Sequence, residues 1–336
     1  MSRGAPIGSR ESRATSSASG KSPRRKTSSF ALLLAPLSWL YGTVAGRRAR
    51  SWRDRRKTLT AKVVSVGNLT FGGTGKTPTV IYLATRFLDA GRRIAILSRG
   101  YGAQGPEGND EAQVIARHLP ALPHFQDPDR HRAGSKVDGQ FDLFLLDDGF
   151  QHHPLHRDFD LVLVDATDPF GGGWCPPGGR LREPLSSLAR ADGVVITRAD
   201  QVEREDLGAT MREIRARTTA PVATARFAPA CAADLTGLAV LVACGIGNPH
   251  AFVATVRELG ADVAATRIFR DHHAFSPDDA ASLAADGRPV VVTEKDAVEL
   301  QPLWPADGPP LHVVTIEFTF VEGGEPLLAA LDAAIA

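Results

Sequence analysis

Cysteine is scarce in this sequence. The 336 residues include three cysteines, Cys175, Cys231 and Cys244, which lie far apart and in no CxxC spacing. Such a set provides neither a disulfide framework nor a zinc knuckle, and it suits a reducing compartment. We therefore expect each cysteine to pack as a small apolar side chain.

An excess of charge of either sign is also missing, because 39 Lys and Arg nearly balance 38 Asp and Glu and leave a net charge of +1. This balance argues against a protein that binds nucleic acid through its overall charge, and we expect no nucleic-acid partner. No obligatory protein partner is implied either. With 43% hydrophobic residues, the chain is long enough for two globular domains, each with its own core.

Long hydrophobic runs are absent as well. Residues 30–46, FALLLAPLSWLYGTVAG, fall short of the ~20 residues that a membrane-spanning helix needs, and Pro36 interrupts them. The run carries Trp39 and Tyr41, and a dense group of arginines follows it: Arg47, Arg48, Arg50, Arg53, Arg55 and Arg56. We predict that residues 30–57 form a helix that lies on an anionic membrane leaflet. The alternative is a helix that packs on the protein's own core, with its arginines in solvent.

The first 29 residues contain almost no large apolar side chains and are rich in Ser, Arg, Lys and Gly. Such a segment cannot bury enough surface to offset the entropy of ordering it, so we predict a disordered tail. A targeting peptide is the alternative, although no small-residue cleavage site clearly follows.

The chemistry of the chain centres on residues 64–78, VSVGNLTFGGTGKTP, where an apolar run leads into a glycine-rich turn. Glycines let the backbone approach a ligand closely, and N–H groups ahead of a helix bind anions. In a phosphate-binding loop of this kind, a lysine in the position of Lys76 reaches the β- and γ-phosphates. The hydroxyl that follows, here Thr77, ligates Mg²⁺.

One position departs from the usual pattern of this loop, because Thr70 stands where a glycine is expected. We expect Gly72 and Gly73 to supply the missing flexibility. The alternative is a glycine-rich β-turn with a surface lysine, which does not explain the apolar strand before it and the helix after it.

From Lys62 onward, nearly continuous apolar strands alternate with helical segments. This rhythm predicts a parallel sheet covered by helices on both faces, whose ligands bind beyond the carboxyl ends of the strands. We predict an α/β fold with a P-loop domain over residues 58–234. A smaller α/β domain is predicted over residues 235–336, with a cleft between the two.

Asp147 and Asp148 follow the apolar run 141–146, at the position where a carboxylate holds Mg²⁺ beside the phosphate-binding loop. Because successive side chains of a strand point to opposite faces, we expect only one of them to face the metal directly. The alternative is a strand end that turns into solvent.

Three further polar motifs suggest weaker sites. Residues 151–153 and His156 have a metal-like spacing, but without a cysteine or a further acid they predict a polar loop near the phosphates better than a zinc site. Residues 293–296, TEKD, place the lysine one position late for a guanine-reading loop. Residues 271–273, DHH, pair a carboxylate with histidine, which can orient or charge the ring; ordinary surface histidines are the alternative.

Taken in order, these and other motifs resemble the tetraacyldisaccharide 4′-kinase (lipid A 4′-kinase) family. The motifs are PLSWLYG, VGNLTFGGTGKTP, SRGYG, GNDE, LDDGFQHH, PPGGRLREP, RADGVVITR, FRDHHAFS and TEKDAVEL. They run from about Leu34 to Leu300 and are far more specific than a phosphate-binding loop alone. Asn109 departs from the family's usual glycine.

The resemblance implies transfer of the γ-phosphate of ATP to the 4′-hydroxyl of a tetraacyldisaccharide 1-phosphate, which forms lipid IVA. It also implies a peripheral protein at the cytoplasmic face of the bacterial inner membrane, with the lipid disaccharide and the anionic leaflet as partners. The implied ATP-binding residues are Thr70, Phe71, Gly72, Gly73, Thr74, Gly75, Lys76 and Thr77. Those implied at the Mg²⁺ site are Thr77, Asp147, Asp148 and Glu183, with Gln151 lining the active site. Asp110 is implied as the base toward the sugar hydroxyl, with His272 as its partner and Lys76 as a catalytic cation.

Two other functions stay open. One is a P-loop ATPase of the partitioning or metallochaperone type, whose nucleotide state switches partner binding; it does not explain the apolar N-terminal segment. The other is a membrane-surface scaffold with a vestigial nucleotide site. Phosphorylation of a lipid disaccharide, hydrolysis stimulated by a protein, or neither would distinguish the three.

Overall fold

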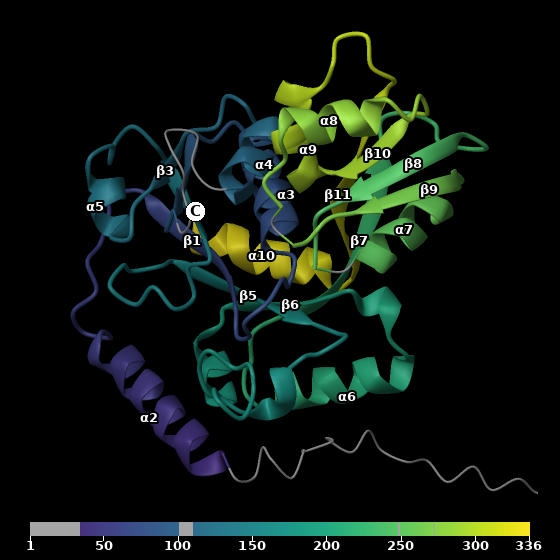
Figure 1. Cartoon of the computed structure of the whole chain (residues 1–336). Helices are drawn as coiled ribbons and strands as arrows, with labels where there is room; N and C mark the ends of the chain where they lie inside the picture. The colour runs from purple at the N-terminus through teal and green to yellow at the C-terminus, as the bar shows by residue number, and fades with distance from the viewer. Residues whose placement is uncertain (1–33, 101–109, 248, 272) are drawn as a thin grey trace, which may run out of the picture.

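The computed structural model describes residues 34–100, 110–247, 249–271 and 273–336. The predicted tail of residues 1–29 lies outside this part. One sheet of eleven strands, in the order β3-β2-β4-β1-β5-β6-β7-β11-β10-β8-β9, runs through the molecule (Figure 1). Its strands are β1 (Lys62–Asn68), β2 (Ile94–Ser98), β3 (His124–Gln126), β4 (Leu143–Asp147), β5 (Phe159–Asp165), β6 (Gly193–Thr197), β7 (Val222–Cys231), β8 (Ala239–Cys244), β9 (Asp262–Ile268), β10 (Val290–Thr293) and β11 (Leu311–Glu322). The α-helices are α2 (Ala35–Ser51), α3 (Lys76–Asp89), α4 (Asp110–His118), α5 (Arg130–Ser135), α6 (Arg204–Arg215), α7 (Pro249–Glu258), α8 (Pro277–Ala284), α9 (Glu294–Leu300) and α10 (Gly324–Ala334).

The sheet is parallel at every pairing except β7 with β11, which are antiparallel. Helices cover both of its faces: α3 and α10 pack on one side of β5, through Leu161, and α6 packs on the other, through Val162. The predicted helix-covered parallel sheet is therefore confirmed. The strand β9 ends at Ile268, before the DHH motif of residues 271–273.

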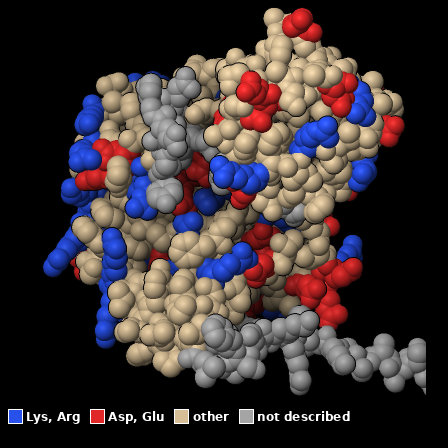
Figure 2. All heavy atoms as spheres, viewed as in Figure 1, with Lys and Arg blue, Asp and Glu red and all other residues tan. Residues whose placement is uncertain are grey.

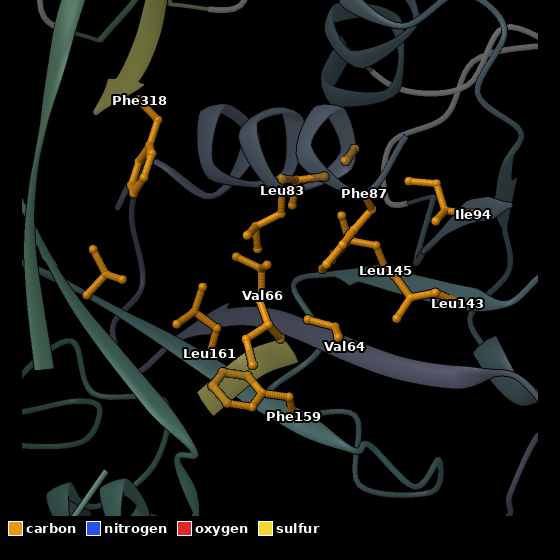
Figure 3. Close-up of a cluster of buried hydrophobic side chains, with 14 of the residues drawn as sticks. Val64, Val66, Leu83, Phe87, Ile94, Leu143, Leu145, Phe159, Leu161 and Phe318 are labelled. Carbon is orange, nitrogen blue, oxygen red and sulfur yellow. The ribbon is translucent and has the colours of Figure 1, made fainter. Parts of the chain in front are cut away.

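The central core lies between the sheet and α3. Figure 3 shows Leu83 and Phe87 of α3 facing Val64 and Val66 of β1. Leu327 of α10, near the C-terminus, joins the same buried cluster. The last helix of the chain thus packs on the half that carries the glycine loop, and the sheet continues through both halves. The domain boundary between residues 234 and 235 stays a prediction.

The arrangement of the central strands brings distant motifs together. β1 and β4 are parallel neighbours, and Val66 of β1 pairs with Asp147 of β4. Because both strands end at the same edge of the sheet, the glycine loop after β1 and the aspartates after β4 become neighbours.

The helix α2 begins at Ala35 and has Pro36 in its first turn. A proline there replaces an N–H that has no partner in a helix, so Pro36 starts the helix rather than interrupting it. The helix also continues through Arg50, farther than the apolar run. Within the described ranges, no helix is both long and apolar enough to cross a membrane.

Candidate active site

The loop between β1 and α3 has the backbone of a phosphate-binding site. Gly72 and Gly75 take positive φ angles of 121° and 85°, which favour glycine. Gly73 does not, so the flexibility expected of Gly72 and Gly73 is located at Gly72 and Gly75 instead. Thr70 is buried, has no positive φ and bridges to Leu181, which explains why a glycine is not needed there.

Surrounding segments hold this loop through its carbonyl groups. Thr197 Oγ1 donates a hydrogen bond to the Thr74 carbonyl at 3.1 Å, and Arg198 Nη1 donates one to the Gly73 carbonyl at 3.0 Å. The backbone N–H groups of residues 72–75 have no acceptor in the part of the chain that the structure describes. The loop therefore offers its donors to an anion, at the positive end of α3.

Lys76 Nζ lies 3.6 Å from Asp148 Oδ1, and Arg182 Nη1 lies 2.8 Å from both oxygens of the same carboxylate. Burial alone would raise the pKa of Asp148, but Lys76 and Arg182 hold it below its ordinary value. Asp148 has a φ of 54° and has left the strand. We expected only one aspartate to face the metal because strand side chains alternate between faces. That rule does not apply to Asp148, which lies outside the strand.

Asp147 is buried at the end of β4, and its Oδ1 has no hydrogen-bond partner within the described ranges. Burial, together with the nearby charge of Glu111, raises the pKa of Asp147 to about 7. A buried carboxylate oxygen without a donor fits a divalent cation, which takes oxygen ligands. The unpartnered oxygen of Asp147 is thus compatible with the predicted Mg²⁺ site, and the roles of Thr77, Asp147 and Asp148 there stay a prediction.

Glu183 lies elsewhere in the network. Its carboxylate accepts hydrogen bonds from Arg190 at 2.9 and 3.2 Å and from Ser187 at 2.9 Å, and His153 Nε2 is 3.6 Å away. These buried contacts satisfy its charge without Lys76 or the aspartates. Its role at the metal stays a prediction that its contacts do not favour.

Gln151 contacts the strand that leads into the glycine loop, and the two histidines that follow it are uncharged. Gln151 Nε2 donates to the Asn68 carbonyl at 3.0 Å, behind the glycine loop. Burial, with the charges of neighbouring arginines, lowers the pKa of both His152 and His153 to about 3, so both rings are neutral. In the described part of the chain, no group of three or more His, Cys, Asp or Glu side chains is placed to hold a metal.

Two candidate catalytic residues fall where the structure says little. Asp110 begins α4, but its side chain lies outside the described residues, as does the whole of His272. Sequence reasoning missed two charged neighbours of the aspartates. Glu111 follows Asp110 directly, and Arg130, a buried arginine at the start of α5, influences Asp148. The GNDE motif could have suggested Glu111, whereas nothing in the sequence around Arg130 marks it.

Three comparisons with known proteins match most of the chain to the same protein family. A family model described as tetraacyldisaccharide-1-P 4′-kinase matches residues 30–336. The tetraacyldisaccharide 4′-kinase of Anaeromyxobacter sp. (strain K) is 39% identical over 82% of each chain, and that of Geobacter metallireducens is 35% identical over 89% of this chain and 97% of the relative. A crystal structure of LpxK from Aquifex aeolicus in complex with ATP superposes with a TM-score of 0.73 at 26% identity, and covers 91% of this chain and 100% of that one.

Proposed function

The chain belongs to the tetraacyldisaccharide-1-P 4′-kinase family, and on that premise we propose how its residues carry out the reaction. It is an ATP-dependent kinase of lipid A biosynthesis that phosphorylates the 4′-hydroxyl of a tetraacyldisaccharide 1-phosphate. The observation that carries the mechanism is the position of Lys76 beside Asp148, next to the unpartnered oxygen of Asp147.

The glycine loop, residues 70–77, binds the phosphates of ATP through its backbone N–H groups. The charge of Lys76 is paired with Asp148 in the described structure. When ATP enters, we propose that Lys76 turns to the β- and γ-phosphates while Arg182 continues to neutralise Asp148. This exchange keeps every charge paired, and it places a cation where charge develops during phosphoryl transfer.

Thr77, Asp147 and Asp148 would hold Mg²⁺, which when bound offsets the negative charge of the β- and γ-phosphates. Binding of the cation would also offset a cost of folding, because the Oδ1 atom of the buried Asp147 carboxylate otherwise loses its hydration without gaining a donor from the described residues. A bound cation would therefore favour the ionised form of Asp147, whose pKa burial raises to about 7.

The proton of the 4′-hydroxyl passes to Asp110, with His272 as the partner that orients or charges it. The hydroxyl oxygen bonds to the γ-phosphorus as the bond from that phosphorus to the bridging oxygen breaks, and ADP leaves. This assignment is supported by Glu111, whose charge acts on Asp147 from the first turn of α4. The helix that begins with Asp110 is therefore close to the metal-binding carboxylate.

We also propose that α2 rests on the cytoplasmic leaflet of the inner membrane, where the lipid substrate lies. Its small residues Ser38, Gly42 and Ala49 are buried against the protein. Its large apolar side chains instead face outward: Leu37, Trp39, Leu40, Tyr41 and Val44. A helix that packs by small residues and exposes large apolar ones is suited to a second, apolar surface, and arginines at its end suit anionic headgroups.

The direct test incubates the protein with ATP, Mg²⁺ and tetraacyldisaccharide 1-phosphate in detergent micelles. We expect one phosphate at the 4′ position, located by mass spectrometry and ³¹P NMR. The matched control is the 4′-deoxy disaccharide, which should stay unmodified. Hydrolysis of ATP at the same rate with and without lipid, and with no phosphorylated lipid, would contradict the kinase function.

A further inference from the structure

A cavity of about 620 Å³ separates α2 from the segment 173–190. One hydrogen bond joins α2 to this segment, because the Gly178 N–H donates to Ser38 Oγ at 2.9 Å. The residues that line the cavity include none of the glycine loop and neither aspartate of the active site. It is therefore a separate place from the nucleotide site.

The lining of the cavity changes from apolar to basic along α2. Near the start of the helix it is apolar, with Pro184 and Leu185, and it opens beside Trp39, whose side chain is largely exposed and so reaches both the cavity and the outer face. Near and beyond the end of the helix it is basic, with Arg50, Arg53 and Arg56. From Trp39 to Arg50 the helix rises ~16 Å at 1.5 Å per residue. Figure 2 shows the same polarity on the outer surface: tan over the lower end of α2 and blue over its upper end.

The described residues balance the positive charge at the basic end only in part. Asp160 is the carboxylate that acts on Arg56, and it is itself paired with Arg157. Arg190 is paired with Glu183, whereas Arg50, Arg53 and Arg56 form no ion pair with any residue that the structure describes. The Nε atoms of Arg56 and Arg190 are buried and have no acceptor among the residues that the structure describes. Burial and the repulsion of nearby arginines lower the pKa of Arg56. Buried donors with excess positive charge are incomplete until an anion joins them.

We propose that this cavity binds an anionic membrane phospholipid, with its phosphate among Arg53, Arg56 and Arg190 and an acyl chain along α2 toward Trp39. A lipid is favoured over a free anion because the basic end continues into an apolar groove. A membrane source is favoured because the outer face of α2 is the surface that we propose rests on the bilayer. The inference rests on that proposed contact, but it concerns the inner face of the helix.

The test uses the full chain and dihexanoyl phosphatidylglycerol, a short-chain lipid that stays monomeric at low concentration, with binding followed by calorimetry. The cavity variant is Arg53→Gln with Arg56→Gln. The matched control is Arg47→Gln with Arg48→Gln, which removes the same charge from the same segment outside the cavity lining. We expect one lipid per chain for the wild type and the control, and at least tenfold weaker binding for the cavity variant. Thermal unfolding of both variants checks that each one folds.

Three further measurements separate the possible occupants. Dihexanoyl phosphatidylcholine should bind at least tenfold more weakly than the anionic lipid, because its headgroup carries no net charge. Inorganic phosphate that binds as tightly as the lipid would overturn the proposal in favour of a simple anion site. A cavity variant that retains lipid binding but has a raised KM for tetraacyldisaccharide 1-phosphate would overturn it in favour of the substrate's own phosphate. Turnover of the wild type in phospholipid-free micelles tests the kinase function independently.

Discussion

The ring of Phe227, on β7, lies over Gly75 at the end of the glycine loop. A Cβ built on Gly75 would come within 1.8 Å of the ring atom Cζ. The guanidinium of Arg198, which holds the Gly73 carbonyl, lies 5.6 Å from the centre of the same ring. A side chain some 150 positions later in the sequence thus packs against the phosphate-binding backbone.

Gly75→Ala should therefore lower both stability and ATP affinity. The added methyl group would have to displace Phe227, and the φ of 85° disfavours alanine; overpacking alone typically costs about 1–3 kcal/mol. Urea unfolding and nucleotide titration measure the two effects. Gly73→Ala is the matched control, because a Cβ there meets no atom within 4 Å and should leave the free energy of unfolding nearly unchanged. Equal losses of unfolding free energy in both variants would contradict the role of Phe227.

Lys76→Ala should lower kcat/KM on the lipid substrate by ~10²–10³, the usual effect of removing one preorganised group that stabilises transition-state charge. Arg182 still neutralises Asp148 in this variant, so the fold should survive. Steady-state kinetics and thermal unfolding measure the two properties. Lys136→Ala, which removes an exposed lysine after α5, is the control and should retain activity. A folded Lys76→Ala protein with near-normal turnover would show that the glycine loop is not the ATP site.

Asp110→Ala and His272→Ala should each lower the single-turnover rate, by ~10²–10⁴ for a general base, with little change in ATP affinity. Because the two act as one unit, the double variant should lose little more than the worse single variant. Asp262→Ala, at an exposed carboxylate of β9, is the control. Fully multiplicative losses in the double variant would reject the pairing but not the kinase function.

Leu40→Asp with Val44→Asp should reduce binding to anionic vesicles by tenfold or more, since each buried apolar side chain contributes about 1.5–3 kcal/mol. Co-sedimentation with vesicles measures the effect. Leu88→Asp adds a charge at another exposed apolar position, on α3, and should bind like the wild type. Removal of residues 1–29 should also leave binding unchanged. A protein truncated to begin near residue 58 that still sediments with vesicles would place the membrane contact outside α2.

Acid should destabilise the protein through His124. Burial lowers the pKa of this ring to about 4, and its Nδ1 has no partner within the described structure while Nε2 pairs with Ser98 at 2.7 Å. Between pH 6.5 and about 4 the unfolded chain binds a proton that the folded ring does not, so this contribution to stability is complete above pH 6.5 and falls as pH decreases. Denaturant unfolding across that window should show a smaller pH dependence for His124→Gln. If the free energy of unfolding of His124→Gln depends on pH as strongly as that of the wild type, the ring titrates normally in the folded protein.

Local patterns were enough to predict much of the molecule. Apolar runs before the glycine loop and before Asp147 identified the central strands β1 and β4, because a strand buried on both faces must be apolar along its length. Ser276 and Pro277 have the residue types that favour a helix start, and α8 begins there, with a capping box between Ser276 and Asp279. Such features depend on neighbouring residues only, so the sequence displays them directly.

Other features depend on distant parts of the chain. Chain segments that meet only after folding produce three such features. Leu327 of α10 packs in the central core, the ring of Phe227 lies over Gly75, and Arg130 is buried. The direction of the Asp148 side chain was likewise inferred from strand alternation, but its backbone has a φ of 54° and is not part of a strand. Sequence spacing carries no information about contacts of this kind.

By itself, the sequence determined the nucleotide loop, the parallel sheet and the family, because glycine spacing, strand hydrophobicity and motif order are properties of the chain in one dimension. The tertiary structure alone decided that Glu183 is neutralised by Arg190, that Asp147 keeps an oxygen without a partner and that α2 encloses a basic cavity. Charge balance and burial are sums over all neighbours in three dimensions. The same carboxylate or guanidinium can be paired or unpaired depending on which segments the fold brings to it.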